Sequence, residues 1–310
     1  MLEILEPALF TSVQDAGRTG WQAFGVPRGG PIDAFAHRAA NLLIANPPGA
    51  AALEIGITSA HLLAHTDCVI AAGGAGFGLF VDAKSLPLWT SVYVRAGQRI
   101  WFEKVEGGNW AVLAIHGAIQ SPPAPARLQS GQILAVGRSA NFPYGLAGRQ
   151  ISRDLFDYAA YRSRGLFVLP GPQESYFTAD SLDNFYSHRY QISPNSDRVG
   201  YRLTDSPLQR AHGGELLSEG MARGCIQVPP GGQPILMQAD CPTTGGYPKV
   251  ASVIAADQPI LAQVPFGAGQ ISFMPIDIAS AQAEYRARMR ALDEEIGHTS
   301  SDDDYLWAGF

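Results

Sequence analysis

Short apolar runs separated by turn residues recur along this sequence and limit the folds that it can adopt. Between residues 51 and 136 they follow one another at roughly 8–12 residues, which is the spacing of short strands joined by turns. The 34 glycines and 22 prolines supply the frequent reversals that such a chain needs. The pattern predicts an antiparallel β-barrel or β-sandwich in the first half. The candidate strands there are residues 52–55, 59–63, 68–72, 77–81, 91–94, 99–102 and 110–115.

A second set of apolar runs, which includes 165–169, 224–228, 235–238 and 250–254, predicts further strands in the second half. Asp33 is a good N-cap for a helix over residues 34–45, and apolar residues at 3/4 spacing predict a helix over 278–296. We therefore expect a mainly β fold with a few helices. We expect its parts to be residues 1–164, residues 165–276, and a C-terminal helix with a flexible acidic tail over 277–310. The Pro-rich residues 121–125 are interpreted as a surface connection.

The composition argues against several classes of protein. A net charge of −6 gives no electrostatic footprint for nucleic acid or for an anionic membrane. The sequence lacks an apolar segment of the roughly 20 residues that span a bilayer, and it lacks the pattern of a signal peptide. Its three cysteines form neither a CxxC pair nor a disulfide framework, which favours a cytoplasmic location. We expect no metal site, since there is no HExxH motif and His61 and His65 form an isolated pair.

The stretch with the most chemical groups is the polar block from Asp240 to Lys249. It brings an acid, two hydroxyls, a glycine pair, a tyrosine and a lysine into about one loop's length. Gly245 and Gly246 can reach φ > 0, approach a ligand closely and turn their N–H groups towards an anion. The block is therefore either a functional loop of a binding site or a hairpin turn whose polar side chains have no role in binding.

Several segments, in this order, resemble a known family. The sequence resembles the allophanate hydrolase subunit 2 family, which includes the C subunit of 5-oxoprolinase and covers the biotin-dependent carboxyltransferase part of urea carboxylase. The resemblance covers roughly residues 2–276. The matching segments are SVQDAGR (12–18) through GVPRGGPID (25–33) to ANL (40–42), AALE (51–54), LPGPQ (169–173), SDRVGYRL (196–203), LSEG (217–220), IQVP (226–229) and TTGGYPK (243–249).

The sequence departs from the family in its first half. Family members usually carry a Gly-Ser-Arg-Ser-Thr segment after the strand that here is residues 110–115, whereas this chain is cut short between residues 119 and 133. His116 also stands where a glycine is more usual. This shortening could mean a trimmed substrate pocket, a different partner surface or a changed role.

The resemblance implies two cyclophilin-like β-barrel domains, and the fold name does not imply prolyl isomerase activity. It implies a hydrolase component that pairs with a cyclophilin-like protein resembling the B subunit of 5-oxoprolinase, and that acts with a separate A subunit. The system would use ATP with Mg²⁺, bound at least partly by the complex, to open the lactam of 5-oxo-L-proline to L-glutamate. The isolated chain is expected to be inactive.

Two alternatives stay open. One is biotin-dependent carboxyl transfer to an amide or urea, which would need a separate carrier because this chain has no Met-Lys-Met type attachment sequence and so no biotin attached. The other is a non-catalytic role, in which the chain regulates a sensor histidine kinase through its partner subunit.

In the light of this resemblance, positive charge and hydrogen-bond donors are the groups that a phosphoryl-transfer site needs most. Lys249, Arg198 and Arg202 are the candidates for holding anions. Asp240 and Glu219 could hold a metal or orient a nucleophile. The candidates for contact with developing negative charge or with the substrate are Thr243, Thr244, Gly245, Gly246, Tyr201 and Tyr247, and the first half supplies Gln14, Asp15, Arg18 and Asp33. Each also has a structural interpretation, Asp33 as an N-cap and Arg198 as the partner of Asp197 in a turn.

Overall fold

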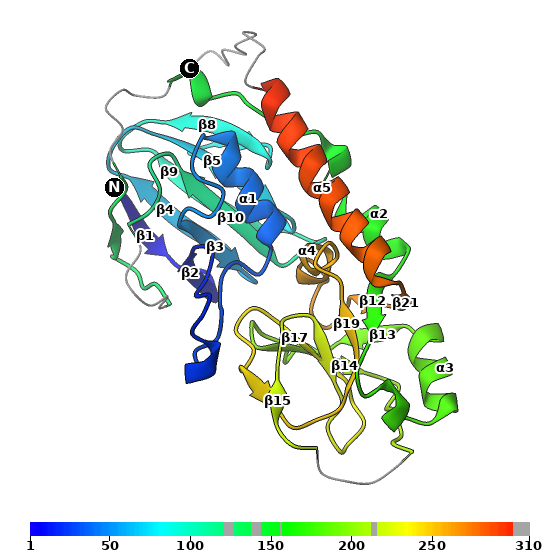
Figure 1. The fold of residues 1–310 in the computed structure, drawn as a ribbon. Coiled ribbons are helices and arrows are strands. Elements are labelled where there is room, and N and C mark those ends of the chain that lie inside the picture. The colour runs from blue at the N-terminus through cyan, green and yellow to red at the C-terminus, as the bar shows by residue number, and fades with distance from the viewer. Residues whose placement is uncertain (121–126, 138–143, 156, 212–215, 300–310) are drawn as a thin grey trace. The chain divides into compact units, whose positions relative to one another are not determined.

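The structure is a computed structural model that describes residues 1–120, 127–137, 144–155, 157–211 and 216–299 (Figure 1). The chain forms two compact units. Unit 1 consists of Met1–Ala16, Asp33–Asp157 and Met289–Phe310, and unit 2 of Gly17–Ile32 and Tyr158–Arg288. The connection expected over 121–125 and the acidic tail after residue 299 lie outside the described residues.

Unit 1 is built from two antiparallel sheets, a six-stranded one in the order β11-β1-β4-β9-β6-β7 and a five-stranded one in the order β2-β3-β10-β5-β8. Its strands are β1 (Leu2–Glu6), β2 (Phe10–Gln14), β3 (Ala52–Gly56), β4 (Ala60–Ala64), β5 (Cys68–Gly74), β6 (Phe77–Val81), β7 (Lys84–Leu86), β8 (Thr90–Val94), β9 (Arg99–Lys104), β10 (Trp110–Ile115) and β11 (Ile133–Leu134). Its helices are α1 (Ala34–Leu43) and the 3-10 turns η2 (Tyr144–Leu146) and η3 (Arg153–Leu155).

The core of unit 1 lies between these two sheets. Along β1 the buried residues Leu2 and Ile4 alternate with half-buried ones, so one face of the strand points inward. Buried side chains from both sheets form a single cluster, and each fully buried aliphatic residue contributes about 1.5–3 kcal/mol. Strand β10 is buried along its whole length because α1 contacts its sheet as well. Gly56 must lack a side chain, since a methyl group there would collide with the ring of Trp110.

Unit 2 contains an eight-stranded sheet in the order β20-β13-β14-β17-β16-β19-β12-β21 and a separate two-stranded ribbon, β15-β18. Its strands are β12 (Leu166–Pro170), β13 (Tyr190–Ile192), β14 (Gly200–Thr204), β15 (Glu219–Gly220), β16 (Cys225–Gln227), β17 (Ile235–Met237), β18 (Thr244–Gly245), β19 (Lys249–Val253), β20 (Gln270–Ile271) and β21 (Phe273–Pro275). Its helices are η1 (Gln22–Phe24), α2 (Tyr158–Ser163), η4 (Glu174–Tyr176), α3 (Ala179–Ser187) and α4 (Gln258–Ala262).

An aromatic cluster stabilises one end of the eight-stranded sheet. The ring of Phe185, from α3, stacks on Phe273 of β21 with centroids 4.8 Å apart, and Tyr190 of β13 tilts against both rings. All three side chains are fully buried or nearly so. Strands β12 and β21 pair in parallel, and β12 pairs antiparallel with β19 on its other side.

The mainly β class with a few helices is confirmed, and each unit has its own sheets and core. The C-terminal helix is confirmed as α5 (Ile278–Thr299). Helix α1 ends at Leu43, two residues before the predicted end, and Asp33 caps it by accepting a hydrogen bond from Ala36 N at 2.8 Å. The short helices α2, α3 and α4 were not predicted, because elements of five to nine residues carry little periodicity. The division into residues 1–164 and 165–276 stays a prediction.

Candidate functional site

Lys249, at the start of β19, has its charged group inside unit 2. Its side chain is only 6% exposed, and its Nζ lies 3.3 Å from Glu219 Oε2 and 3.2 Å from the carbonyl oxygen of Gly220. Glu219 is 39% exposed, so the ion pair is buried on one side and reaches solvent on the other. Two predicted catalytic residues that are far apart in sequence are thus brought into contact.

Gln173, which the sequence interpretation did not select, connects the two members of this pair. Its Nε2 donates to Glu219 Oε1 at 2.6 Å, and its Oε1 accepts from the backbone N–H of Lys249 at 3.1 Å. It ends the LPGPQ segment that carries part of the family resemblance. No local signal distinguishes it, because its partners lie 46 and 76 residues away in the sequence.

Arg198 and Asp240 form a second, bidentate ion pair in unit 2. Arg198 Nε lies 2.8 Å from Asp240 Oδ2, and Arg198 Nη2 lies 3.1 Å from Oδ1 and 2.8 Å from the carbonyl oxygen of Gly30. The neighbouring Asp197 accepts from Val199 N and Gly200 N and so forms the turn itself. The principal partner of Arg198 is therefore Asp240 rather than the adjacent aspartate.

The loop 17–32 packs against this second pair. Gly29 N donates to the carbonyl oxygen of Ala239 at 3.1 Å, and Gly29 has φ +64°. A methyl group on Gly29 would lie 2.9 Å from Arg18 Nη2 and 3.7 Å from Asp240 Oδ1, so the loop needs a glycine here. Arg18, expected to act with the first half, thus lies close to a predicted residue of the second half within unit 2.

The glycine pair of the polar block does not have the conformation that the sequence predicted. Neither Gly245 nor Gly246 has φ > 0. Gly245 pairs with Glu219 in the β15-β18 ribbon, and a methyl group on it would collide with Met221 Cε and lie 3.1 Å from Gln227 Oε1. Its lack of a side chain therefore allows close packing rather than a left-handed turn.

Thr243, Thr244 and Tyr247 are the other predicted site residues of the block. The carbonyl of Thr243 accepts from Met221 N at 2.9 Å, so its backbone continues the ribbon. Thr244 is exposed on β18 opposite Gly220, and Tyr247 is exposed as well. The side chains of Thr244 and Tyr247 are thus available to a ligand or a partner.

Tyr201 is not a surface residue. Alternation along β14 turns Tyr201 into the core and Arg202 to solvent. The hydroxyl of Tyr201 donates to the carbonyl oxygen of Ala262 at 3.2 Å, and its ring packs against Phe266. A direct contact between Tyr201 and substrate would require the core to open, whereas Arg202 stays accessible.

Gln14, Asp15 and Asp33 belong to unit 1. Asp33 is fully buried as the N-cap of α1, and Gln14 is buried at the end of β2, where its Nε2 donates to Ser12 Oγ. His37 of α1 is also buried, with its Nε2 3.1 Å from the carbonyl oxygen of Gln14. Burial lowers the pKa of His37, which is therefore neutral at pH 7.

The thiol next to Asp240 is not a nucleophile at neutral pH. Burial, as the largest cause, raises the pKa of Cys241 to about 11. Among the described residues no group of three or more His, Cys, Asp or Glu side chains could hold a metal ion. Within the same residues, no helix is long and apolar enough to cross a membrane.

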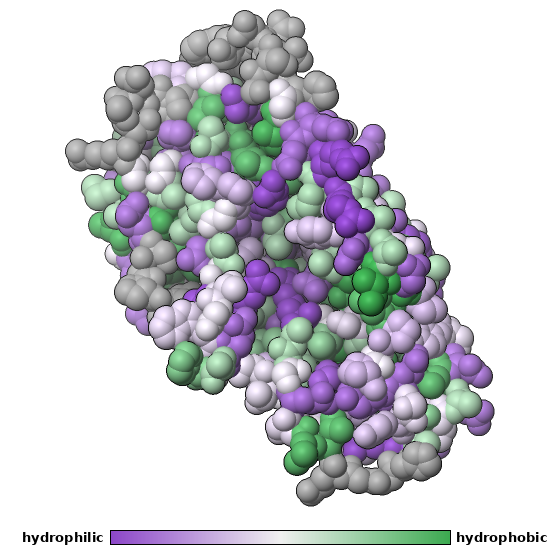
Figure 2. All heavy atoms as spheres, in the orientation of Figure 1, coloured by the Kyte–Doolittle hydropathy of each residue, from purple (hydrophilic) through white to green (hydrophobic). Residues whose placement is uncertain are grey.

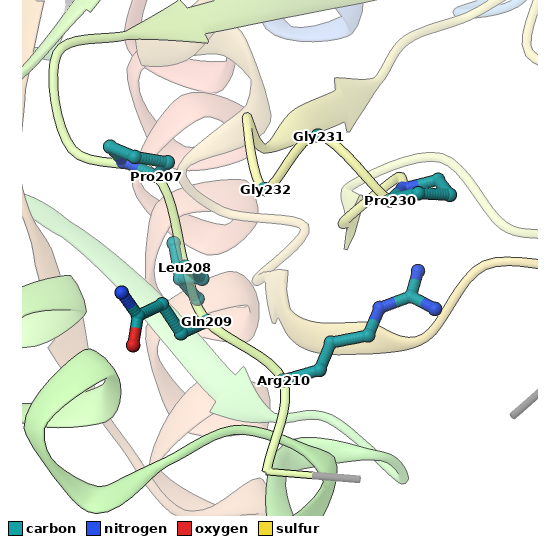
Figure 3. A pocket seen from close by; sticks show the side chains of 7 residues that line it. All are labelled: Pro207, Leu208, Gln209, Arg210, Pro230, Gly231 and Gly232. Atoms are coloured by element: carbon teal, nitrogen blue, oxygen red, sulfur yellow. The ribbon is translucent and has the colours of Figure 1, made fainter. Parts of the chain in front are cut away.

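A shallow pocket of about 470 Å³ lies elsewhere in unit 2 (Figure 3). It is lined by Pro207, Leu208, Gln209, Arg210, Pro230, Gly231 and Gly232, none of which was a predicted site residue. Arg210 Nη2 donates to the carbonyl oxygen of Val228 at 2.8 Å. The two ion pairs, which combine charge, burial and exposed neighbours, make a better candidate site than this pocket.

The chain is similar to known proteins over most of its length. It is 35% identical over 284 residues to the C subunit of 5-oxoprolinase of Escherichia coli (strain K12), covering 86% of this chain and 89% of that protein. It is 32% identical over 301 residues to the C subunit of 5-oxoprolinase of Haemophilus influenzae, covering 95% and 97%. The crystal structure of the urea amidolyase of K. lactis matches 95% of this chain with a TM-score of 0.82 and 24% identity.

The match to solved structures covers only part of their chains. This chain spans 20% of the urea amidolyase chain and 55% or 56% of three other solved chains. The family model described as "Carboxyltransferase domain, subdomain A and B" matches residues 24–275, which contain both ion pairs. Together with the identity to two proteins that it covers almost completely, this match shows that the chain belongs to the carboxyltransferase domain, subdomain A and B, family.

Proposed function

We propose that this chain is the C subunit of an ATP-dependent 5-oxoprolinase. The observation that carries the proposal is the match in extent with the C subunit of 5-oxoprolinase of Escherichia coli, since 86% of one chain aligns with 89% of the other. In the urea amidolyase, by contrast, the matching segment makes up only 20% of a much longer chain. The identity to the urea amidolyase is also lower, 24% against 35%, so the C subunit is the better guide to the role of this chain.

The proposed reaction activates a lactam, whose carbon is protected from water by amide resonance. The lactam oxygen attacks the γ-phosphorus of ATP and ADP leaves. Water then adds to the ring carbon, and the C–N bond breaks with its electron pair and a proton going to nitrogen. A second water hydrolyses the resulting acyl phosphate, which gives glutamate and phosphate.

Positioning and positive charge are what phosphoryl transfer needs from a protein. Lys249 and Arg198 carry that charge in unit 2, and each is held by a carboxylate, Glu219 and Asp240 respectively. ATP would enter with Mg²⁺, which usually binds through phosphate oxygens, water and one or two carboxylates. Glu219 and Asp240, each more than one-third exposed, are the carboxylates that could take part.

We also propose that the chain works in a complex with a B-like subunit and a separate A subunit. Two of its relatives are named as subunits, and large apolar residues such as Trp21, Phe24 and Leu217 are exposed in unit 2. On the face in Figure 2, apolar residues form separate patches among polar ones, and exposed apolar patches can mark sites of contact with other proteins. Co-expression with the B-like protein should give one species by size-exclusion chromatography, and two stable monomers would contradict this part.

The activity itself is tested by reconstitution of the three proteins. ATP hydrolysis should require 5-oxo-L-proline, should release glutamate in equal amount and should not need a biotinylated carrier. An ATPase that ignores 5-oxoproline but requires bicarbonate and biotinylated protein would refute the proposal.

That second outcome would support the other candidate, the carboxyltransferase component of a biotin-dependent amide or urea carboxylase. The specific observations in its favour are the carboxyltransferase family model and the urea amidolyase fold over 95% of the chain. In that case Lys249 would bind the carboxyl group in transfer. Omitting the biotinylated carrier from the reconstituted mixture distinguishes the two candidates in one experiment.

A further inference from the structure

Gln227, at the end of β16, carries a buried hydrogen-bond acceptor that the fold leaves unused. The residue is 8% exposed, and its Oε1 has no hydrogen-bond partner among the described residues. Buried side-chain oxygens nearly always have a partner in native proteins, so an unpaired one needs an explanation. A bound water, an ion or a functional role of the group is the usual one.

The surroundings of this oxygen include the charged group of Lys249. Gln227 and Lys249 are backbone partners in the antiparallel pair β16-β19, next to a register shift between Ile226 and Gln227. Side chains in opposite positions point to the same face of a sheet. An unpaired acceptor and a buried ammonium group are therefore neighbours on one face of unit 2.

The β15-β18 ribbon covers both groups. A methyl group on Gly245 would lie 3.1 Å from Gln227 Oε1, and Gly220, on the facing strand, accepts from Lys249 Nζ at 3.2 Å. The ribbon consists of two residue pairs, and both Gly220 and Thr244 are exposed. An element with so few buried contacts opens more easily than the sheet beneath it.

The edge of a lactam fits this pair of groups. Ring closure holds the amide in the cis form, so its N–H and its C=O point to the same side. Gln227 Oε1 can accept from that N–H while Lys249 Nζ donates to the carbonyl oxygen. A trans secondary amide, the ordinary form in peptides, presents the two groups on opposite sides and does not fit.

We propose that Gln227 Oε1 accepts a hydrogen bond from the ring N–H of a lactam substrate that binds beside Lys249. The β15-β18 ribbon covers this site and moves away to admit the substrate. This inference rests on the proposed function and names the residue that selects cyclic amides. Glu219 and Gly220 hold Lys249 in the closed state, and the lactam oxygen replaces Gly220 O as its acceptor when the ribbon opens. Primary amides and urea present the same edge, so they are the competitors that Gln227 does not reject.

The test compares two ligands of the same ring size, one with the ring N–H and one with a CH₂ group in its place. Calorimetry on the assembled complex gives Kd for 5-oxo-L-proline and for 3-oxocyclopentane-1-carboxylate, in which a CH₂ group replaces the N–H. The wild type should bind the lactam about tenfold more tightly, since the ketone leaves the acceptor unpaired. In Gln227→Met the ratio should fall to about one, and in Gln227→Glu, which keeps an acceptor oxygen, a preference for the lactam should return.

The exposed Gln233→Met is the matched control and should keep the wild-type ratio. An equal affinity of the wild type for both ligands, or an unchanged ratio in Gln227→Met, would overturn the assignment. Because the wild-type measurement needs no variant, the assignment stays open to refutation even if Gln227→Met fails to assemble. A wild-type complex that binds neither ligand would overturn the proposed function and this inference with it, whereas lactam-dependent ATPase with an unchanged ratio would overturn the inference alone.

Discussion

Removal of Glu219 should destabilise the protein more than removal of Lys249, although Lys249 is the more buried partner of the two. Lys249→Met keeps most of the buried side-chain volume, and such swaps usually cost less than about 1.5 kcal/mol. The carboxylate left behind is 39% exposed and still accepts from Gln173 Nε2, so it stays solvated. The ion pair itself, open to water on one side, contributes about 0–1 kcal/mol.

Glu219→Ala has the opposite effect. It leaves an ammonium group in a site that is 6% exposed, with the carbonyl of Gly220 as the acceptor that remains among the described residues. It also removes the acceptor of Gln173 Nε2. Breaking a buried pair in this way costs about 3–5 kcal/mol, and the partial exposure of Glu219 reduces this to about 2–3 kcal/mol.

Urea denaturation of the isolated variants gives the free energies of unfolding, with the exposed Lys84→Met as the control. In the assembled complex, Lys249→Met should lower the 5-oxoproline-dependent ATPase by roughly a hundredfold or more, as loss of one charge-stabilising group does. A larger loss of stability in Lys249→Met than in Glu219→Ala would refute the reasoning from burial. Normal turnover in Lys249→Met would remove Lys249 from the site.

Three further predictions concern other parts of the structure. Gly245→Val should lower the free energy of unfolding by about 1–3 kcal/mol and lower activity, because the valine side chain would collide with Met221. Gly220→Val, on the facing strand with open space around it, should leave the temperature of thermal unfolding close to that of the wild type. Burial lowers the pKa of His37 below 6.5 in the folded protein. As the pH falls, His37 therefore becomes protonated in the unfolded chain at a higher pH than in the folded protein. Stability should therefore be complete above about pH 6.5 and fall below it by up to about 1.4 kcal/mol per pH unit, and His37→Gln should reduce that slope in denaturation curves from pH 5 to 7.5. Arg198→Lys should lower the free energy of unfolding in urea by about 2 kcal/mol, because lysine cannot form the bidentate pair. The exposed Arg202→Lys is the control, and a loss in Arg198→Lys as small as in this control would contradict the prediction.

The regular elements of the fold could be predicted because their signals are local. Short apolar runs bounded by turn residues identified most strands of unit 1, among them β4, β6 and β9. Asp33 marked the start of α1, and the 3/4 spacing marked α5. These signals depend on neighbours within a few residues, so no tertiary information was needed to read them.

The sequence also carried the family, because several long segments match in order over most of the chain. It indicated the polar block at residues 240–249 as the region to examine. It could not tell which of the block's side chains are buried, since a lysine at the start of a strand can be either a surface or an interior residue.

Only the tertiary structure decided the partners of the charged groups. Arg198 meets the carbonyl of Gly30 across 168 residues of sequence, Lys249 meets Glu219, and Gln173 joins that pair without any local signal. The reason that the sequence suggested for a glycine at position 245 was wrong, because close packing depends on residues that reach it from other strands. Periodicity and capping act over one turn or one strand, whereas charge pairing, burial and packing depend on which strands the fold places side by side.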